Sequence, residues 1–223
     1  MSKTVLVVAA HADDEALGCG GSLAKHVAAG DEVHVIFVAD GVTSRSGAGQ
    51  EEMVRRKQAT ENARNILGIS TMAFLDLPDN RLDSLPLLDI VQPLEALIGK
   101  LLPEIIYTHH YGDLNADHRI VHQAVMTACR PLPGSTVKEI LTFEVMSSTE
   151  WSSPGLAPFL PNLFVDISAY MEIKMQALEA YELEMRAPPH SRSAEHLRYL
   201  AKHHGYRSGV YAAEAFMVMR ILR

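Results

Sequence analysis

The chain has 223 residues, of which 48% are hydrophobic and 21% are charged, a composition that is ordinary for a soluble globular protein. Its formal net charge is −7 at pH 7, and no block of Lys and Arg occurs along it. These features argue against a nucleic-acid backbone or an anionic membrane surface as the main partner.

Apolar runs rich in β-branched residues alternate with segments of helical periodicity through the first part of the chain. Such runs predict strands that are buried on both faces. In chain order, strands are expected at 4–10, 32–40, 73–77, 104–110, 140–145 and 163–167, and helices at 15–30, 51–68, 85–102 and 118–130. A turn-rich loop is expected at 147–161 and a long helix at 168–185, before the Met-rich segment 213–222 closes the chain.

This order of elements indicates an α/β fold. Strands that alternate with helices through residue 130 predict βαβ units and a mostly parallel sheet. Because crossover connections are right-handed, the helices are expected on both faces, which makes a Rossmann-like three-layer sandwich. We find no linker or repeat, so residues 1–223 are expected to form a single domain.

The cellular setting is inferred from cysteine usage and hydropathy. Cys19 and Cys129 are too few for a disulfide framework, and both lie in apolar helical patterns. No apolar stretch approaches the roughly 18 residues that are needed to span a bilayer. We therefore expect a cytoplasmic protein without a membrane span.

Two clusters of metal-ligand residue types follow strands of the predicted sheet. His11, Asp13 and Asp14 come directly after the first strand, and the segment 113–118, DLNADH, follows the fourth. In open α/β sheets, ligands bind beyond the carboxyl ends of the strands, near the point where the strand order reverses. Since the first and fourth strands are neighbours in a doubly wound sheet, we expect the two clusters to meet.

These clusters suit a catalytic zinc ion. His11 and Asp14 are three residues apart across a strand-to-helix turn, and His118 can supply a third ligand. Three protein ligands and one open position are typical of catalytic zinc, and a set of two His and one Asp favours zinc over magnesium or calcium. Asp13 is then free to act as a general base toward water that zinc has acidified.

Two simpler interpretations of the first cluster were considered. Acidic residues are favoured at any helix start by the helix dipole and the free N–H groups. The glycines at 18, 20 and 21 superficially resemble a dinucleotide loop, but acids occupy the place where phosphate would bind. The glycines are expected instead to allow close packing of the helix on the sheet.

The motif HADDEALGCGG (11–21) resembles the A-H-P-D-D-E-x-x-G-x-G-G signature of the PIG-L/LmbE-like zinc-dependent N-deacetylases, with Ala12 in place of the usual proline. Further segments resemble other family motifs: RRKQATENARNILGI (55–69), FLDLPDNRLD (74–83), DLNADHRIVHQAV (113–125) and GVYAAEAFMVMR (209–220). The resemblance implies a Rossmann-like fold and removal of acetyl groups from N-acetylglucosamine units. It also implies one zinc ion per chain, with His11, Asp14 and His118 as ligands and Asp13 as the base.

One position departs from the family pattern. Many members have His-x-Asp-His in the second motif, whereas this chain has Asn115-Ala116-Asp117-His118. The resemblance implies a catalytic place for Asn115, as a donor to an oxyanion, and for Asp117, as a group that orients Asn115 or a histidine. Asn cannot protonate the leaving amine, so the acid stays open among His109, His110, Tyr111 and a protonated Asp13.

The substrate is expected to be a small N-acetylated amino sugar or its conjugate. Arg45 and Arg81 lie on loops that should rim the site, and His110 and Tyr111 are further candidates for substrate contact. Two alternatives stay open: an amidase of a sugar–thiol conjugate, and a zinc-binding protein without catalysis. The loop 147–161 is a candidate for contacts in a homo-oligomer or for a lid.

Overall fold

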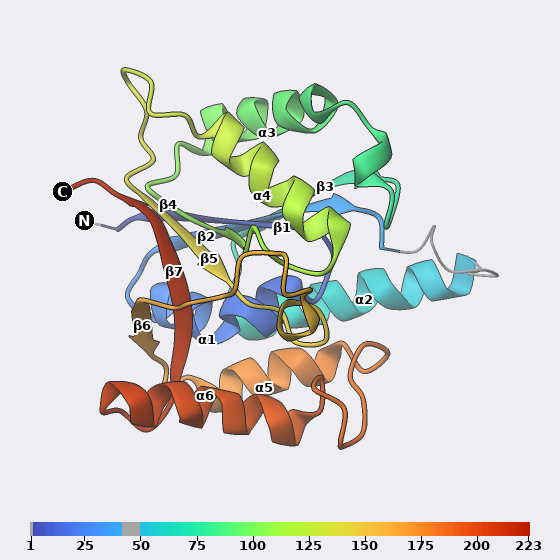
Figure 1. Cartoon of the computed structure of the whole chain (residues 1–223), viewed down its shortest axis with the longest axis vertical. Coiled ribbons are helices and arrows are strands. Elements are labelled where there is room, and N and C mark those ends of the chain that lie inside the picture. Colours follow the sequence, from blue (N-terminus) through green and yellow to red (C-terminus); the bar gives the residue numbers. More distant parts are fainter. Residues whose placement is uncertain (1, 42–49) are drawn as a thin grey trace.

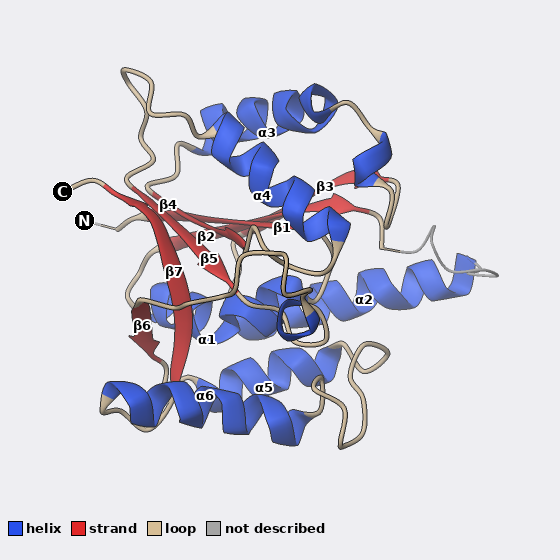
Figure 2. Cartoon of the chain, in the orientation of Figure 1, coloured by secondary structure: helices blue, strands red, loops and turns tan. Residues whose placement is uncertain are grey.

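The protein folds around one seven-stranded, mostly parallel sheet, seen in a computed structural model that describes residues 2–41 and 50–223 (Figure 2). The strand order is β3-β2-β1-β4-β5-β7-β6. The first five strands run parallel, while β7 runs antiparallel to both β5 and β6. This arrangement confirms the predicted α/β class.

The elements follow the predicted alternation closely. The strands are β1 (Thr4–Ala9), β2 (Glu32–Ala39), β3 (Thr71–Leu77), β4 (Ile105–His109), β5 (Glu139–Phe143), β6 (Leu163–Asp166) and β7 (Ala213–Ile221). The helices are α1 (Asp14–Ala28), α2 (Gln50–Leu67), α3 (Leu87–Leu101), α4 (Ala116–Ala128), α5 (Met171–Ala180) and α6 (Ala194–Ser208), with two 3-10 helices, η1 (Leu82–Ser84) and η2 (Thr149–Trp151).

Helices cover both faces of the sheet (Figure 1). Alternate residues of β1 point to opposite faces, so Val5 and Val7 enter one core while Leu6 and Val8 enter the other. The first core includes residues of α1, α2, α5 and α6, and the second includes residues of α3 and α4. Strands that are buried on both sides explain the unbroken apolar runs in the sequence.

The sheet reverses its order between β1 and β4. These two strands are neighbours, with Val5 opposite Ile105 and Val7 opposite Tyr107. The chain leaves β1 toward the face that carries α1, whereas it leaves β4 toward the face that carries α4 (Figure 1). The loops that follow β1 and β4 therefore diverge around one crevice, which is where ligands bind in sheets of this type.

The predicted helix at 168–185 is too long at both ends. The α-helix covers only Met171–Ala180, and turns occupy residues 168–170 and 181–184. The physical reason at the C-terminal end is tertiary contact: the Tyr181 hydroxyl donates to Glu15 at 2.7 Å, and Glu184 accepts from Arg56 at 2.9 Å. These contacts outweigh the local helix propensity of the segment.

A buried ion pair braces the middle of α1. Glu214 of β7 accepts hydrogen bonds from the N–H groups of Gly21 (2.9 Å) and Ser22 (2.7 Å). Lys174 of α5 donates to the Leu17 carbonyl (2.8 Å) and to Glu214 (2.5 Å). In a regular helix, the Leu17 carbonyl accepts a hydrogen bond from the Gly21 N–H. Lys174 and Glu214, both from the C-terminal half of the chain, therefore bind the two groups of this one backbone pair.

Among residues 2–41 and 50–223, none of the helices combines the length and apolarity that crossing a membrane requires.

The glycines of α1 allow the close packing that the sequence predicted, at two of the three positions. A Cβ added at Gly18 would overlap the ring of Phe143, and one at Gly21 would lie 2.8 Å from the Ile167 side chain. At Gly20 the nearest atom would be 3.6 Å away, which is an ordinary contact.

We expect Gly18→Ala to lower the free energy of unfolding by about 1–3 kcal/mol, since the rigid Phe143 ring must move. Gly99→Ala is the matched control, because Gly99 lies in α3 with open space around it. That change should raise the free energy of unfolding by about 0.5–1 kcal/mol through helix propensity. Urea denaturation followed by circular dichroism measures both, and equal effects at the two sites would contradict the packing argument.

Candidate metal centre

The side chains of His11, Asp14 and His118 converge in the crevice between β1 and β4. One potential ligand atom from each lies within 4.8 Å of the others, and all three residues are buried. Asp14 Oδ2 is 3.4 Å from His11 Nδ1 and 3.5 Å from His118 Nε2. The structure thus brings together the two clusters that the sequence placed after neighbouring strands.

The chemistry of this group fits a divalent cation. Asp14 is fully buried, and its Oδ1 atom has no hydrogen-bond partner within the described part of the chain. Burial alone would raise the pKa of Asp14, but the charge of His118 and a hydrogen bond from His11 hold it well below its usual range. A buried ionised carboxylate beside two imidazoles needs positive charge, which a metal ion supplies.

The carboxylate of Asp113 orients the His118 ring. Asp113 Oδ1 lies 3.2 Å from His118 Nδ1, on the side of the ring away from Asp14. Asp113 also accepts hydrogen bonds from the Ser148 hydroxyl, the Thr149 hydroxyl (2.5 Å) and the Asn115 N–H (2.8 Å). Burial would raise the pKa of Asp113, but these bonds and the His118 charge keep it below its usual range, so the carboxylate stays ionised.

Two further carboxylates hold the other imidazole. His11 Nε2 lies 3.0 Å from Asp79 Oδ1 and 3.2 Å from Asp117 Oδ2. Asp117 is itself fixed by the N–H groups of Asn80 (2.7 Å) and Leu82 (3.1 Å). Such outer carboxylates set the tautomer of a ligating histidine. The sequence predicted that Asp117 orients Asn115 or a histidine, and the histidine that its carboxylate contacts is His11.

Asn115 begins α4. Its side-chain oxygen accepts a hydrogen bond from the Asp117 N–H at 2.8 Å, which is an N-cap. Its amide nitrogen lies 3.5 Å from the Asn80 side-chain oxygen. The catalytic role expected for Asn115 stays a prediction, and only its amide N–H groups are available for it.

His109 is held in a neutral, accepting state. Its Nε2 accepts the Ala10 N–H at 2.8 Å, and its ring stacks on His118 with the centroids 3.9 Å apart. Burial, followed by the His118 charge, lowers the pKa of His109 well below its usual value. An imidazole in this setting is a poor candidate for protonating a leaving group.

Asp13 sits beside the cluster in a strained backbone conformation. Its φ is 134°, a region that residues other than glycine rarely adopt. The Asp13 N–H donates to Glu15 at 3.1 Å, and its carboxylate accepts from Arg192 at 2.8 Å. Burial raises the pKa of Asp13 to about 6, with Arg192 opposing the shift.

A cavity of about 160 Å³ opens beside Asp13 and His11. The remaining residues of its lining are Gly41, Arg56, Asp79, Asn80, Asn115, Glu184 and Arg192. The sequence motifs do not predict that Arg56, Glu184 or Arg192 line this cavity. Arg56 belongs to a basic run that looks solvated in sequence, and nothing local marks the other two.

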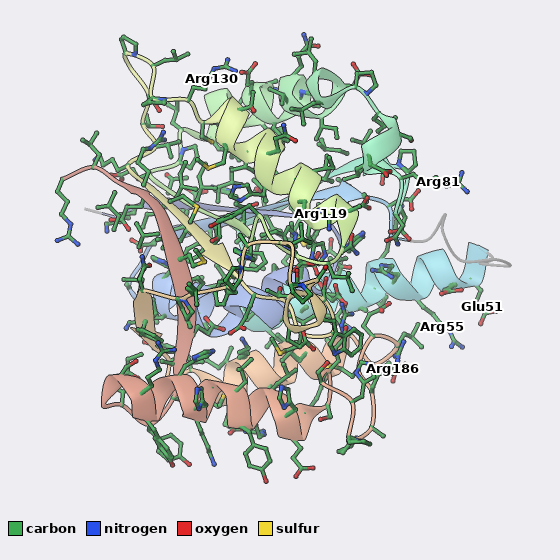
Figure 3. All side chains as sticks on the ribbon, in the orientation of Figure 1. Glu51, Arg55, Arg81, Arg119, Arg130 and Arg186 are labelled. Atoms are coloured by element: carbon green, nitrogen blue, oxygen red, sulfur yellow. The ribbon has the colours of Figure 1, made fainter. Side chains whose placement is uncertain are left out.

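The predicted substrate residues lie outside this lining. Arg81 is exposed and its side chain extends away from the molecule (Figure 3). His110 is buried and its Nε2 lies 2.8 Å from the Ala157 carbonyl oxygen, while the neighbouring Tyr111 is 41% exposed. Arg45 lies outside the described residues. Contact of these four residues with a substrate therefore stays a prediction.

Comparisons with known proteins agree with the sequence motifs. A model of the PIG-L family, described as GlcNAc-PI de-N-acetylase, matches residues 6–129. The chain is 34% identical over 186 residues to the uncharacterized deacetylase YaiS of Escherichia coli (strain K12), covering 81% of this chain and 91% of that protein. It is 26% identical over 224 residues to the diacetylchitobiose deacetylase of Thermococcus kodakarensis, covering 95% and 81% of the two chains.

A solved structure of an enzyme with a different activity is also similar. The 4-carboxy-2-hydroxymuconate hydratase GalB from Pseudomonas putida KT2440 has a TM-score of 0.79 at 20% identity, covering 99% of this chain and 98% of that one. At this identity the similarity shows a shared fold and leaves the reaction open.

We expect Asp113→Asn to weaken Zn²⁺ binding by about 10- to 100-fold, because the amide cannot hold His118 as the carboxylate does. Competition with a chromophoric chelator measures the dissociation constant. Asp89→Asn, an exposed change in α3, serves as the control and should leave the constant unaltered. Unchanged affinity in a folded Asp113→Asn protein would show that the contact with His118 does not support a metal.

Proposed function

The chain belongs to the PIG-L family of GlcNAc-PI de-N-acetylases, and from this premise we propose that it is a zinc-dependent hydrolase that removes the acetyl group from an N-acetylglucosamine-type amino sugar or its conjugate. The observation that carries the proposal is the convergence of His11, Asp14 and His118 in a buried group beside a cavity that Asp13 also lines.

His11, Asp14 and His118 would hold one zinc ion per chain. When bound, such an ion acidifies a water molecule and polarises the carbonyl of the amide. The donor set supports zinc, since two imidazoles and one carboxylate suit it better than they suit magnesium or calcium. Asp113 and Asp117 would keep the two imidazoles in their ligating orientation.

Asp13 would act as the general base. It lines the cavity next to His11, and its carboxylate is fixed by Arg192. His11 is the one imidazole in this cavity's lining as described, and its Nε2 is bound to two carboxylates. We therefore propose that Asp13 also returns the proton to the leaving amine, in preference to His109, His110 and Tyr111.

The carrier of the amino sugar would lie outside the cavity. Arg81 and Tyr111 are exposed and remain our candidates for contact with that part of the substrate, together with Arg45 and the buried His110. The diacetylchitobiose deacetylase among the relatives supports an amino-sugar substrate for this chain.

A hydratase is the second candidate. A 4-oxalmesaconate hydratase of Pseudomonas putida is 26% identical over 191 residues, covering 79% of this chain, so members of this fold also add water to carbon–carbon double bonds. The products separate the two reactions, since deacetylation releases acetate and an amine while hydration releases neither.

Asp13→Asn should lower kcat by about 10²- to 10⁴-fold on N-acetylglucosamine conjugates, because an amide cannot accept the proton from water. Bound zinc, measured by elemental analysis, should remain at one ion per chain. Asp89→Asn again provides the control for a lost surface charge. Full turnover by the Asp13→Asn protein would show that Asp13 is not the general base.

Metal removal tests the reaction itself. Treatment with a chelator should abolish acetate release, and one equivalent of Zn²⁺ should restore it, with acetate and free amine appearing in equal amounts. The panel should include N-acetylglucosamine conjugates, a sugar–thiol amide and 4-oxalmesaconate. Stoichiometric zinc without turnover on any of them would favour a binding role, and consumption of 4-oxalmesaconate alone would favour the hydratase.

A further inference from the structure

We propose that Arg192 is a further catalytic residue of this cavity, which binds the acyl oxygen of the substrate and stabilises the negative charge that develops on it. The proposal rests on the function proposed above. It starts from Asn115, which brings a neutral amide and no imidazole to this part of the cavity lining.

The guanidinium of Arg192 is anchored through two of its three nitrogens. Its Nε donates to the Met146 carbonyl at 3.0 Å, and its Nη1 donates to Asp13 at 2.8 Å. The backbone N–H of Arg192 is bound to His190 Nδ1 at 3.0 Å, which fixes the segment that carries it. Within the described part of the chain, Nη2 has no hydrogen-bond partner, and the side chain is only 18% exposed.

The second guanidinium in the cavity is committed differently. Arg56 binds Glu184 through Nη1 at 2.9 Å and the Ala12 carbonyl through Nη2 at 3.2 Å. Its Nε is buried and has no hydrogen-bond partner among the described residues. Arg56 thus serves the protein with both terminal nitrogens, whereas Arg192 keeps one terminal nitrogen for a ligand.

The charge of the cavity requires such a donor. Asp13, Asp79 and Glu184 line it, so an oxyanion that forms there meets two carboxylates even after Asp13 has taken up the water proton. Asn115 can offer only a neutral amide N–H, because its oxygen caps α4. Burial alone would lower the pKa of Arg192, but Asp13, Asp14 and Glu184 raise it above its usual value, so the guanidinium stays charged. A preorganised cation at low exposure stabilises developing charge strongly.

In the reaction, Arg192 moves no proton. A bond forms between the water oxygen and the acetyl carbon, the carbon–oxygen double bond opens to an oxyanion, and the carbon–nitrogen bond then breaks. One water proton passes to Asp13 and on to the amine nitrogen as the carbonyl re-forms, and the second is released from the acid product, so that acetate and the free amine leave. Nη2 holds the acyl oxygen from the amide through the oxyanion to the acetate product.

The first test compares Arg192→Ala, Arg192→Lys and the control Arg198→Met, which removes a surface guanidinium that pairs with Glu172. We expect Arg192→Ala to lower kcat by about 100-fold with a smaller change in KM, and free guanidinium to restore part of the loss. Arg192→Lys should rescue little, since an ammonium cannot bind Met146, Asp13 and a ligand in one plane. A zinc-loaded Arg192→Ala protein with kcat within threefold of the wild type, or with all of its loss in KM, would overturn the proposal.

The second test does not need turnover. Acetate carries the acyl oxygens of the product, so its binding to the zinc-loaded wild-type protein, followed by isothermal titration calorimetry, should be about 5- to 10-fold tighter than to Arg192→Ala. Arg198→Met should match the wild type. Equal acetate affinity of the wild type and Arg192→Ala, or no saturable binding to the wild type, would overturn the role of Arg192. Loss of acetate affinity in a protein that deacetylates nothing would preserve the anion site while rejecting the proposed function.

Discussion

The burial of several carboxylates in the crevice between β1 and β4 is the constraint on which the rest of this structure depends. Asp14, Asp113 and Asp117 have no exposed surface, so water cannot solvate them. Hydroxyls and backbone N–H groups bind Asp113 and Asp117, and both acids also face an imidazole. Asp14 alone among the three keeps an oxygen, Oδ1, without a partner in the described residues, while its Oδ2 lies 3.4 Å from His11 Nδ1 and 3.5 Å from His118 Nε2. Ionised groups in such surroundings are stable only when positive charge compensates them.

The C-terminal half of the chain serves to hold α1, the helix that begins at Asp14. Lys174 and Glu214 bridge the middle of this helix through its own backbone groups. The Tyr181 hydroxyl binds Glu15, whose pKa burial raises to about 8. These contacts lie within three turns of the candidate metal centre, and they explain why charged residues from distant elements are buried on this side of the sheet. Contacts with α5, with Tyr181 and with β7 thus fix the helix start that presents Asp13 and Asp14.

The two guanidiniums that line the cavity differ in role, since Arg56 supports the fold and Arg192 is proposed to bind the substrate. Arg56 is only 11% exposed, whereas its neighbour Arg55 is 61% exposed and pairs with Glu51 on the outer face of α2 (Figure 3). Arg56 ties α2 to the Ala12 carbonyl, so it supports the backbone that precedes Asp13. Arg192, from the C-terminal part of the chain, binds the carboxylate of Asp13.

The sequence by itself determined the α/β class, the alternation of elements and the place of the site, because apolar runs buried on both faces and right-handed crossovers leave few alternatives. It also indicated His11, Asp14 and His118, since the carboxyl ends of β1 and β4 must adjoin. Only the tertiary structure decided where the helix in 168–185 stops and which cations enter the cavity. Glu184 and Arg192 come from a segment about 170 residues away from His11, and no local pattern distinguishes them from surface residues. Local periodicity reports which face of an element is buried, whereas long-range charge pairing depends on how distant loops pack, and that is specified by the whole chain at once.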